Sequence, residues 1–374
     1  MAKIRIAIAC QGGGSQTAFT AGALKALCEA ALADQFDVVS ISGTSGGAVC
    51  AALVWYAFVK GERPIWERLI NFWKDNAAES WAERTFNQLI IGSSRLVNRG
   101  MAPAFQVSPS SPWLRAMMPF ATIGQRPEFS DFPTLLRNYI DFDEIAAWGP
   151  RPGRPVLIVG AANVSTGKLS KFVSTRESIR LEHILASCAV PSIFPAVQIG
   201  EYAYWDGLFS DNPPVTELIR TGSVGIENIP EEIWLIKINP TACRQVPVRP
   251  GEILDRRNQM EGNISLFHQL IQLEELNDML LAGAFNPDYL ARLDIKAPLR
   301  IPKSFATEPD KPYHIPWIEM SSELHDTLDY ESKIDRDPRN IGRLMEEGEN
   351  SAKRFLAERA ARVGSKPIEQ KRRS

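Results

Sequence analysis

Two glycine-rich junctions, each between an apolar strand and a helix, most constrain the fold of this chain. Residues 4–10 and 36–43 are compact apolar runs rich in β-branched side chains, which predicts two buried strands. Glycines follow each run, and residues with helical spacing come next, over 17–32 and 45–61. The second of these helices is apolar almost all round, which predicts burial. This alternation predicts a parallel sheet with helices on its faces.

The rest of the chain continues the same pattern. Residues 156–164 and 233–239 are apolar runs typical of buried strands, and residues 251–284 keep a helical period. An edge strand is expected near residues 313–320, where its proline would be tolerated. A helix over about 340–362 ends the predicted fold. The sequence therefore predicts an α/β protein with a mostly parallel central sheet.

We predict a single domain over residues 1–362, with a mostly helical insertion over 63–149. Six of the nine Trp lie between residues 55 and 148. These side chains either pack in a core or form a lid or a lipid-contacting surface. Residues 353–374 hold eight Lys or Arg and two Asp or Glu. We expect residues 363–374 to be a basic, disordered tail, with contact to an anionic membrane surface as the alternative.

Composition excludes several classes of protein. The 42 Lys and Arg nearly balance the 44 Asp and Glu, so nothing indicates a nucleic-acid partner. The five cysteines form no C-x-x-C pair, and their odd number favours reduced thiols over a disulfide scaffold or a zinc site. The apolar runs are too short for a transmembrane helix or a secretory signal. We expect a soluble cytoplasmic protein.

The second strand–helix junction contains a G-x-S-x-G pentapeptide, Gly43-Thr44-Ser45-Gly46-Gly47. In a nucleophile elbow the serine occupies a sharp turn from strand to helix, and the flanking glycines leave room for neighbouring elements. The helix that follows stabilises negative charge at its N-terminus. The strand before and the helix after this motif match that context. We therefore predict that Ser45 is a nucleophile; the alternative is an N-cap on a buried helix.

A nucleophilic serine needs a base, and histidine is the usual one. The chain has four histidines, His183, His268, His314 and His325. None lies in a tight loop beside Gly or Asp, where the histidine of a catalytic triad is often found. For each of them we favour a surface or structural role.

A carboxylate is the other candidate base. Asp206 ends a short aromatic strand in an Asp-Gly turn, and sites assemble at strand ends of parallel sheets. Tyr202, Tyr204 and Trp205 are expected to desolvate this carboxylate partly, which would raise its pKa and make it a better base. Asp211 precedes an Asn-Pro-Pro sequence and is interpreted as a turn former.

The first junction holds three consecutive glycines, Gly12, Gly13 and Gly14, which suit the binding of an anion. A dinucleotide fingerprint would need a further glycine where Thr17 stands, and an acid at the end of the second strand, whereas Asp37 begins it. A phosphate-binding P-loop would need a Gly-Lys-Ser/Thr ending, which is missing. Their N–H groups suit an oxyanion hole instead.

Together these stretches resemble the patatin-like phospholipase family. The resemblance rests on the three glycines, the G-x-S-x-G motif, the Asp206-Gly207 turn and the helix and Pro-rich segment over 184–197, and it runs from about residue 4 to about residue 356. Two departures stand out. The family loop usually continues with Arg or Lys and then Gly, where this chain has Gln16 and Thr17. The family turn usually has Gly or Ala where this chain has Leu208.

The resemblance implies a three-layer α/β/α fold and a Ser45–Asp206 dyad without histidine. It implies hydrolysis of acyl esters, with Gly12, Gly13 and Gly14 as the oxyanion hole. Lipids or other acyl esters are then the expected substrates, with peripheral membrane contact and without a metal or organic cofactor. Three alternatives remain: a Ser–His–Asp esterase, an acyltransferase, and a lipid- or nucleotide-binding module without catalysis.

Overall fold

The fold is taken from a computed structural model of the chain. It describes residues 3–30, 36–103, 121–191, 193–243, 245–292 and 315–364, together with residues 112, 116 and 119. The tail predicted over 363–374 lies almost entirely outside the described residues, as do Trp113 and His314.

Eight strands of the described residues form one sheet, in the order β5-β6-β3-β2-β1-β7-β8, with β4 also paired to β3. Their bounds are β1 Ile4–Cys10, β2 Phe36–Thr44, β3 Val156–Asn163, β4 Leu169–Val173, β5 Val197–Ile199, β6 Tyr202–Asp206, β7 Glu232–Lys237 and β8 Trp317–Glu319. The pairs from β3 through β2, β1 and β7 to β8 are parallel, and those of β4, β5 and β6 are antiparallel. The predicted mostly parallel sheet is thus confirmed.

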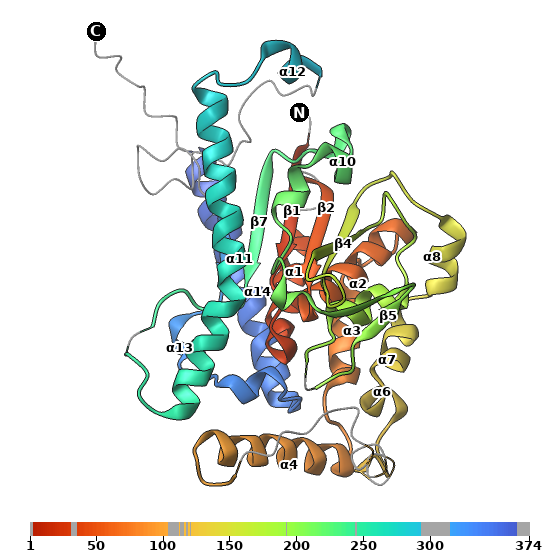
Figure 1. Cartoon of the computed structure of the whole chain (residues 1–374), viewed down its shortest axis with the longest axis vertical. Coiled ribbons are helices and arrows are strands. Elements are labelled where there is room, and N and C mark those ends of the chain that lie inside the picture. The colour runs from red at the N-terminus through yellow and green to blue at the C-terminus, as the bar shows by residue number, and fades with distance from the viewer. Residues whose placement is uncertain are drawn as a thin grey trace.

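Helices cover both faces of this sheet (Figure 1). The α-helices are α1 Ala18–Ala30, α2 Gly46–Lys60, α3 Glu67–Asn76, α4 Trp81–Asn98, α6 Pro127–Ser130, α7 Phe132–Tyr139, α8 Phe142–Trp148, α9 Leu181–Ser187, α10 Thr221–Val224, α11 Pro250–Leu281, α12 Pro287–Arg292, α13 Ser322–His325 and α14 Pro338–Gly364. Short 3₁₀ turns are η1 Gly14–Thr17, η2 Gly207–Phe209, η3 Thr216–Ile219, η4 Ile226–Asn228 and η6 Tyr330–Lys333.

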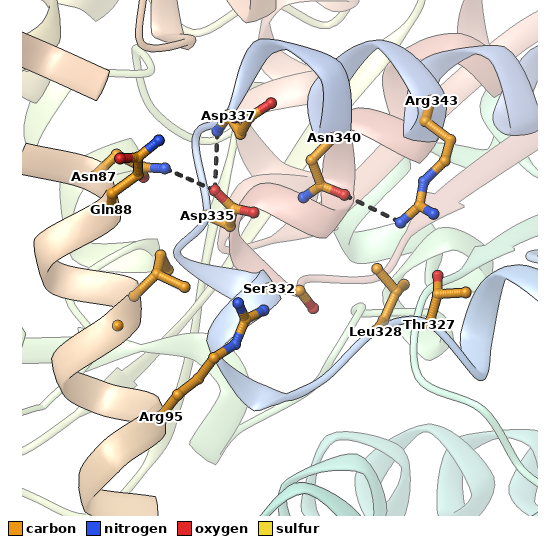
Figure 2. A pocket seen from close by; sticks show the side chains of 12 residues that line it. Asn87, Gln88, Arg95, Thr327, Leu328, Ser332, Asp335, Asp337, Asn340 and Arg343 are labelled. Carbon is orange, nitrogen blue, oxygen red and sulfur yellow. Dashed lines mark hydrogen bonds between the residues drawn. The ribbon is translucent and has the colours of Figure 1, made fainter. Parts of the chain in front are cut away.

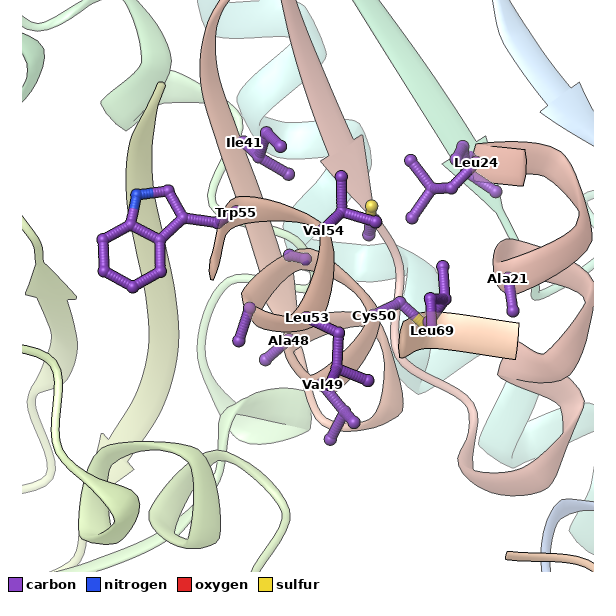
Figure 3. Packing of buried hydrophobic residues seen from close by; sticks show 14 of the residues in the cluster. Ala21, Leu24, Ile41, Ala48, Val49, Cys50, Leu53, Val54, Trp55 and Leu69 are labelled. Carbon is purple, nitrogen blue, oxygen red and sulfur yellow. The ribbon is translucent and has the colours of Figure 1, made fainter. Parts of the chain in front are cut away.

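Alternate side chains of the central strands enter two separate apolar cores. On β1, Ile6 and Ile8 face the core shared with α1, α2 and α14, whereas Ala7 and Ala9 face the core shared with α11. The α2 side chains fill the first core almost all round the helix, as its composition predicts (Figure 3). The two cores make the three layers of an α/β/α fold, with the helices fixing the sheet that positions the site.

The predicted helical insertion over 63–149 contains α3, α4, α6, α7 and α8, and no strand is found in its described part. Its tryptophans differ in their surroundings. Trp73 is buried in the first core, whereas Trp81 at the start of α4 is 82% exposed. These two tryptophans belong to separate helices, because α3 ends at Asn76 and α4 begins at Trp81. That the insertion over 63–149 works as a lid stays a prediction.

The last helix is anchored to the sheet by a buried ion pair. The Arg359 guanidinium of α14 donates from Nε to the Glu232 carboxylate of β7 at 2.9 Å, and its second nitrogen contacts the other carboxylate oxygen. Trp234 Nε1 donates to the same carboxylate at 2.9 Å, and the guanidinium lies 4.6 Å from the centre of the Phe36 ring. Aromatic rings surround the pair and keep water away. Removing either partner would therefore leave the other charge buried without its counter-charge.

We expect the Arg359→Leu variant to lose about 3–5 kcal/mol of unfolding free energy, because the buried Glu232 carboxylate would lose its cationic partner and keep only the Trp234 hydrogen bond. Urea denaturation followed by circular dichroism measures the change. The exposed Arg354→Leu on the same helix is the control and should change stability by less than about 0.5 kcal/mol. Equal losses in both variants would contradict a special contribution from the Glu232 pair.

Candidate active site

Ser45 occupies the turn between β2 and α2 in a strained backbone conformation. Its φ is 55° and its ψ is −134°, and it is the one non-glycine residue with positive φ in the described part of the chain. Its side chain makes no capping hydrogen bond to α2, which argues against the N-cap interpretation. The Ser45 N–H donates to Ser187 Oγ at 2.9 Å, and Ser187 Oγ donates to the Gly160 carbonyl at 2.7 Å. The turn is therefore held to β3 through Ser187.

The glycines of both junctions face one another so closely that side chains would collide. A Cβ on Gly12 would lie 2.8 Å from Ser45 Cβ and 2.6 Å from the Thr44 carbonyl oxygen. A Cβ on Gly43 would lie 2.5 Å from the Gly47 carbonyl oxygen, and one on Gly47 would collide with the Cys10 carbonyl. We expected these glycines to leave room for neighbouring elements. The neighbours are backbone atoms, which come this close because β1 and β2 end side by side.

Strand β3 brings Asp206 next to Ser45. Gly160 pairs with Thr44 at the end of β2, and the next residue, Ala161, pairs with Asp206 at the end of β6. Ala161 also pairs with β4 on its other edge, so β6 continues the edge of β3 where β2 stops. Gly207 permits this approach, since a Cβ there would lie 2.5 Å from the Gly160 carbonyl oxygen.

The Asp206 carboxylate is fully buried. Burial raises its pKa to about 7, while the Ser45 hydroxyl and the Leu208 N–H oppose that rise. The Leu208 N–H donates to Oδ1 at 2.7 Å, so the unusual residue in this turn contributes through its backbone. Oδ2 has no hydrogen-bond partner among the described residues. One carboxylate oxygen is thus free to accept a proton beside Ser45.

The aromatic residues of β6 contribute less to this burial than we expected. Tyr204 is buried, but Tyr202 and Trp205 are exposed, so the expected aromatic enclosure is wrong for these two. Asp206 is enclosed instead by backbone, and its N–H donates to the Ala189 carbonyl at 2.9 Å. Asp211 differs from Asp206, because its carboxylate pairs with Lys171 Nζ at 2.6 Å.

The three glycines of the first loop are not equivalent. The Gly12 N–H donates to Asn212 Oδ1 at 2.7 Å and is therefore already occupied. The N–H groups of Gly13 and Gly14 make no hydrogen bond to any described residue. Gly14 has a φ of 57°, a conformation that favours glycine, and its Cα packs against the Lys333 carbonyl. Two of the three predicted oxyanion donors are thus available.

Gln16 and Thr17, the two departures from the family loop, hold this loop in place. Gln16 Nε2 donates to Ser332 Oγ of η6 at 2.7 Å, and both side chains are buried. Thr17 Oγ1 donates to the Gly14 carbonyl at 2.5 Å. Hydrogen bonds from the uncharged side chains of Gln16 and Thr17 therefore fix the loop, at the two positions where the family loop usually has a cation and a glycine.

Two of the described histidines, His183 and His325, form no hydrogen bond with Ser45. His183 is fully buried, stacks on Phe172 with ring centres 4.1 Å apart and accepts from the Arg180 N–H at Nδ1. Burial lowers the pKa of His183 to about 3 and that of His325 to about 4, which keeps both rings neutral at neutral pH. No hydrogen bond joins either ring to Ser45 in the described part of the structure.

Three supporting residues were not predicted from the sequence. Ser187 orients the Ser45 turn, and Asn212 occupies the Gly12 N–H. Gln11 is fully buried; its Oε1 accepts from the Ile238 N–H at 2.8 Å, and its Nε2 donates to Asn263 Oδ1 at 2.9 Å. The only sequence signal was the position of Gln11 and Asn212 directly beside the glycine loop and the Asp206 turn.

Comparison with known proteins identifies the family of this chain. The family model for patatin-like phospholipases matches residues 8–219, more than half of the 374 residues. The chain belongs to the patatin-like phospholipase family. The matched range contains the glycine loop, Ser45 and Asp206 of this patatin-like chain. No curated protein matches it significantly.

Solved structures give weaker likenesses to the patatin-like chain. VipD from Legionella pneumophila is 14% identical with a TM-score of 0.38, over 95% of this chain and 67% of that one. ExoU in its complex with SpcU from Pseudomonas aeruginosa is 18% identical with a TM-score of 0.26, over 79% of this chain and 57% of that one. The patatin-like chain thus spans roughly half to two thirds of the length of these proteins.

The strain at Ser45 predicts an unusual order of stability. We expect Ser45→Gly to be more stable than Ser45→Ala by about 1 kcal/mol, because glycine relieves the positive-φ strain at a smaller cost in unfolded-state entropy. Thermal and urea unfolding of both variants measure this difference. As a control, Ser93→Gly should be less stable than Ser93→Ala, since Ser93 lies inside α4. The opposite order at position 45 would contradict strain there.

The buried Asp206 also predicts a pH-dependent stability. Its raised pKa means that the folded chain binds a proton that the unfolded chain releases between about pH 4 and pH 7. The penalty for ionisation in the folded state is therefore small below about pH 4 and complete above about pH 7. We expect the stability of Asp206→Asn relative to the parent to rise across this interval in urea unfolding. A difference that is independent of pH would contradict the desolvation of Asp206.

Proposed function

We propose that this chain is an acyl-ester hydrolase with a Ser45–Asp206 dyad. Membership of the patatin-like phospholipase family suggests a lipid acyl hydrolase in general terms. The observation that supports the dyad is the buried Asp206 carboxylate, whose free Oδ2 accompanies a serine held in a strained turn. A base with a pKa near neutrality is well matched to proton transfer at physiological pH.

The proposed reaction has two halves. Asp206 Oδ2 accepts the hydroxyl proton as Ser45 Oγ attacks the ester carbonyl, and the N–H groups of Gly13 and Gly14 stabilise the oxyanion. The C–O bond to the alcohol then breaks, and the alcohol leaves with the proton from Asp206. Water next attacks the acyl-enzyme, giving its proton to Asp206, and the fatty acid leaves as Ser45 regains a proton.

The Gly12 N–H has a structural part in this proposal. It is bound to Asn212 Oδ1, so it orients the loop instead of binding the oxyanion. The positive end of the α2 helix dipole lies at Ser45 and adds to the stabilisation of negative charge.

A fluorophosphonate probe tests the nucleophile and the base directly. The parent chain should be labelled at Ser45, identified by peptide mass spectrometry, and Ser45→Ala should not be labelled. Asp206→Asn should react at least about 100-fold more slowly, because the general base is lost. The rate in the parent should rise with pH to a plateau, with a midpoint near the Asp206 pKa of about 7.

Asp255→Asn is the matched control, because burial also raises the pKa of Asp255, to about 6, and the residue lies on α11. It should keep both the rate and the pH midpoint.

A parent chain that is folded but unlabelled would favour a binding module. Loss of labelling on replacing any of the four histidines by Gln would favour a Ser–His–Asp enzyme. Product analysis with and without an alcohol acceptor separates hydrolysis from acyl transfer.

A further inference from the structure

Helix α4 turns its polar side toward the protein. Glu83, in its first turn, is fully buried and accepts the N–H and the Nε of Arg126, each at 2.9 Å. Burial opposes ionisation of Glu83, but these hydrogen bonds prevail and lower its pKa to about 2. Farther along, Asn87 Nδ2 donates to Asp335 at 2.8 Å. The inner face of α4 is therefore fixed by hydrogen bonds.

The same arrangement continues to the end of the helix. Ser94 Oγ donates to Glu331 Oε1 at 3.3 Å, and Asn98 Nδ2 donates to the same oxygen. Arg95 pairs with Asp329 at 2.9 Å. The contact between α4 and the segment that contains η6 is thus mostly polar, with Ile91 as the buried apolar residue of α4.

A pocket of about 330 Å³, lined mostly by polar residues together with Ile91 and Leu328, lies between α4 and the start of α14 (Figure 2). Asn87, Arg95, Asp335 and Arg343 are among the side chains that line it. An apolar core does not continue under this part of α4. The apolar residues on its outer side are therefore not the edge of such a core.

The outer side of α4 is apolar. Trp81 is 82% exposed, Leu89 66% and Leu96 49%. Residues seven or eight apart lie on one face of a helix, so these three side chains form a single stripe. Ile90, on the flank, is 42% exposed. An amphipathic helix with its apolar side in water has the reverse of the usual orientation for a globular protein.

Helix α4 lies across one end of the molecule, at the bottom of Figure 1. It contacts η6, and η6 in turn contacts η1 of the glycine loop. The Gln16–Ser332 hydrogen bond belongs to this second contact. The stripe is thus on the same end of the sheet as Ser45.

Beside the stripe, the exposed charges that form no ion pair among the described residues are cations, while the exposed Glu79 just before α4 pairs with Arg126 at 3.0 Å. Arg84 and Arg99 are exposed, whereas Glu83, the only acid in residues 81–123, is buried and paired. An exposed apolar stripe flanked by cations is complementary to a bilayer that contains anionic lipids, which takes up apolar side chains and attracts Lys and Arg. Another protein surface would not require cations alone.

We propose that the outer face of α4, formed by Trp81, Leu89, Ile90 and Leu96 with Arg84 and Arg99, docks on the surface of an anionic phospholipid bilayer. The biological purpose of this docking rests on the proposed function, since a lipid hydrolase must reach lipid at an interface. Its physical basis is separate, because the stripe contains no residue of the proposed dyad.

Vesicle sedimentation of the 374-residue Ser45→Ala chain tests the docking without hydrolysis. The chain should bind vesicles of phosphatidylcholine mixed with phosphatidylserine, and added salt should weaken the binding. Adding Leu89→Ser and Leu96→Ser should weaken it at least about tenfold, because two apolar side chains no longer enter the bilayer. Adding Arg84→Gln and Arg99→Gln should weaken it at least about fivefold on these vesicles.

The control is Ile226→Ser with Met279→Ser, which removes two exposed apolar side chains. Ile226 follows α10, and Met279 lies near the end of α11 that leads to α12. Both α10 and α12 are at the end of the molecule away from α4 (Figure 1). It should bind vesicles like the parent. With Ser45 restored, the leucine variant should hydrolyse a water-soluble short-chain ester at the parent rate, so loss of docking is distinguished from loss of the proposed function.

Two results would overturn the proposal. One is sedimentation that is unchanged in the leucine variant or missing in the Ser45→Ala chain. The other is a self-associated chain, seen by analytical ultracentrifugation, that becomes monomeric in the leucine variant while vesicle binding persists. That result would make α4 an interface between copies of this chain.

Discussion

The site depends on the close approach of two backbone turns that leave no space for side chains. Gly12 lies against Ser45, and Gly47 lies against the Cys10 carbonyl, so the ends of β1 and β2 meet with almost nothing between them. This contact determines where the N-terminus of α2 points and where the free N–H groups of the glycine loop lie. The helix layers and the buried Glu232–Arg359 pair keep the sheet in the register that the contact needs.

Two energetically unfavourable features lie side by side at this contact between the turns. Ser45 has a backbone conformation that costs energy, and Asp206 is a carboxylate enclosed without a cation among the described residues. Both costs are sustained by neighbours that are fully hydrogen-bonded, such as Gln11, Ser187 and Asn212. Strain and desolvation concentrated at one point of a well-packed structure are typical of a catalytic centre.

The sequence predicted most strands, the layers and the order of the motifs, because apolar periodicity and glycine spacing are local signals. It did not predict the short antiparallel strands β4 and β5. It did not predict which glycine N–H is occupied, since Asn212 is 200 positions from Gly12. It also left unexplained Gln16, whose partner Ser332 comes from the far end of the chain. The orientation of α4 was equally out of reach, because a helical period shows that two faces exist without showing which one meets the protein.

The contact between Gln16 and Ser332 has a consequence for biosynthesis. The loop leaves the ribosome well before the group that holds it, because Ser332 follows Gln16 by 316 residues. The same is true of α1, which packs against α14. A partly translated chain therefore contains the serine, the aspartate and the glycines without the support that shapes them. The glycine loop and its support therefore come together only after η6 has been synthesised, and a chain that stops before Ser332 lacks the hydrogen bond that holds Gln16.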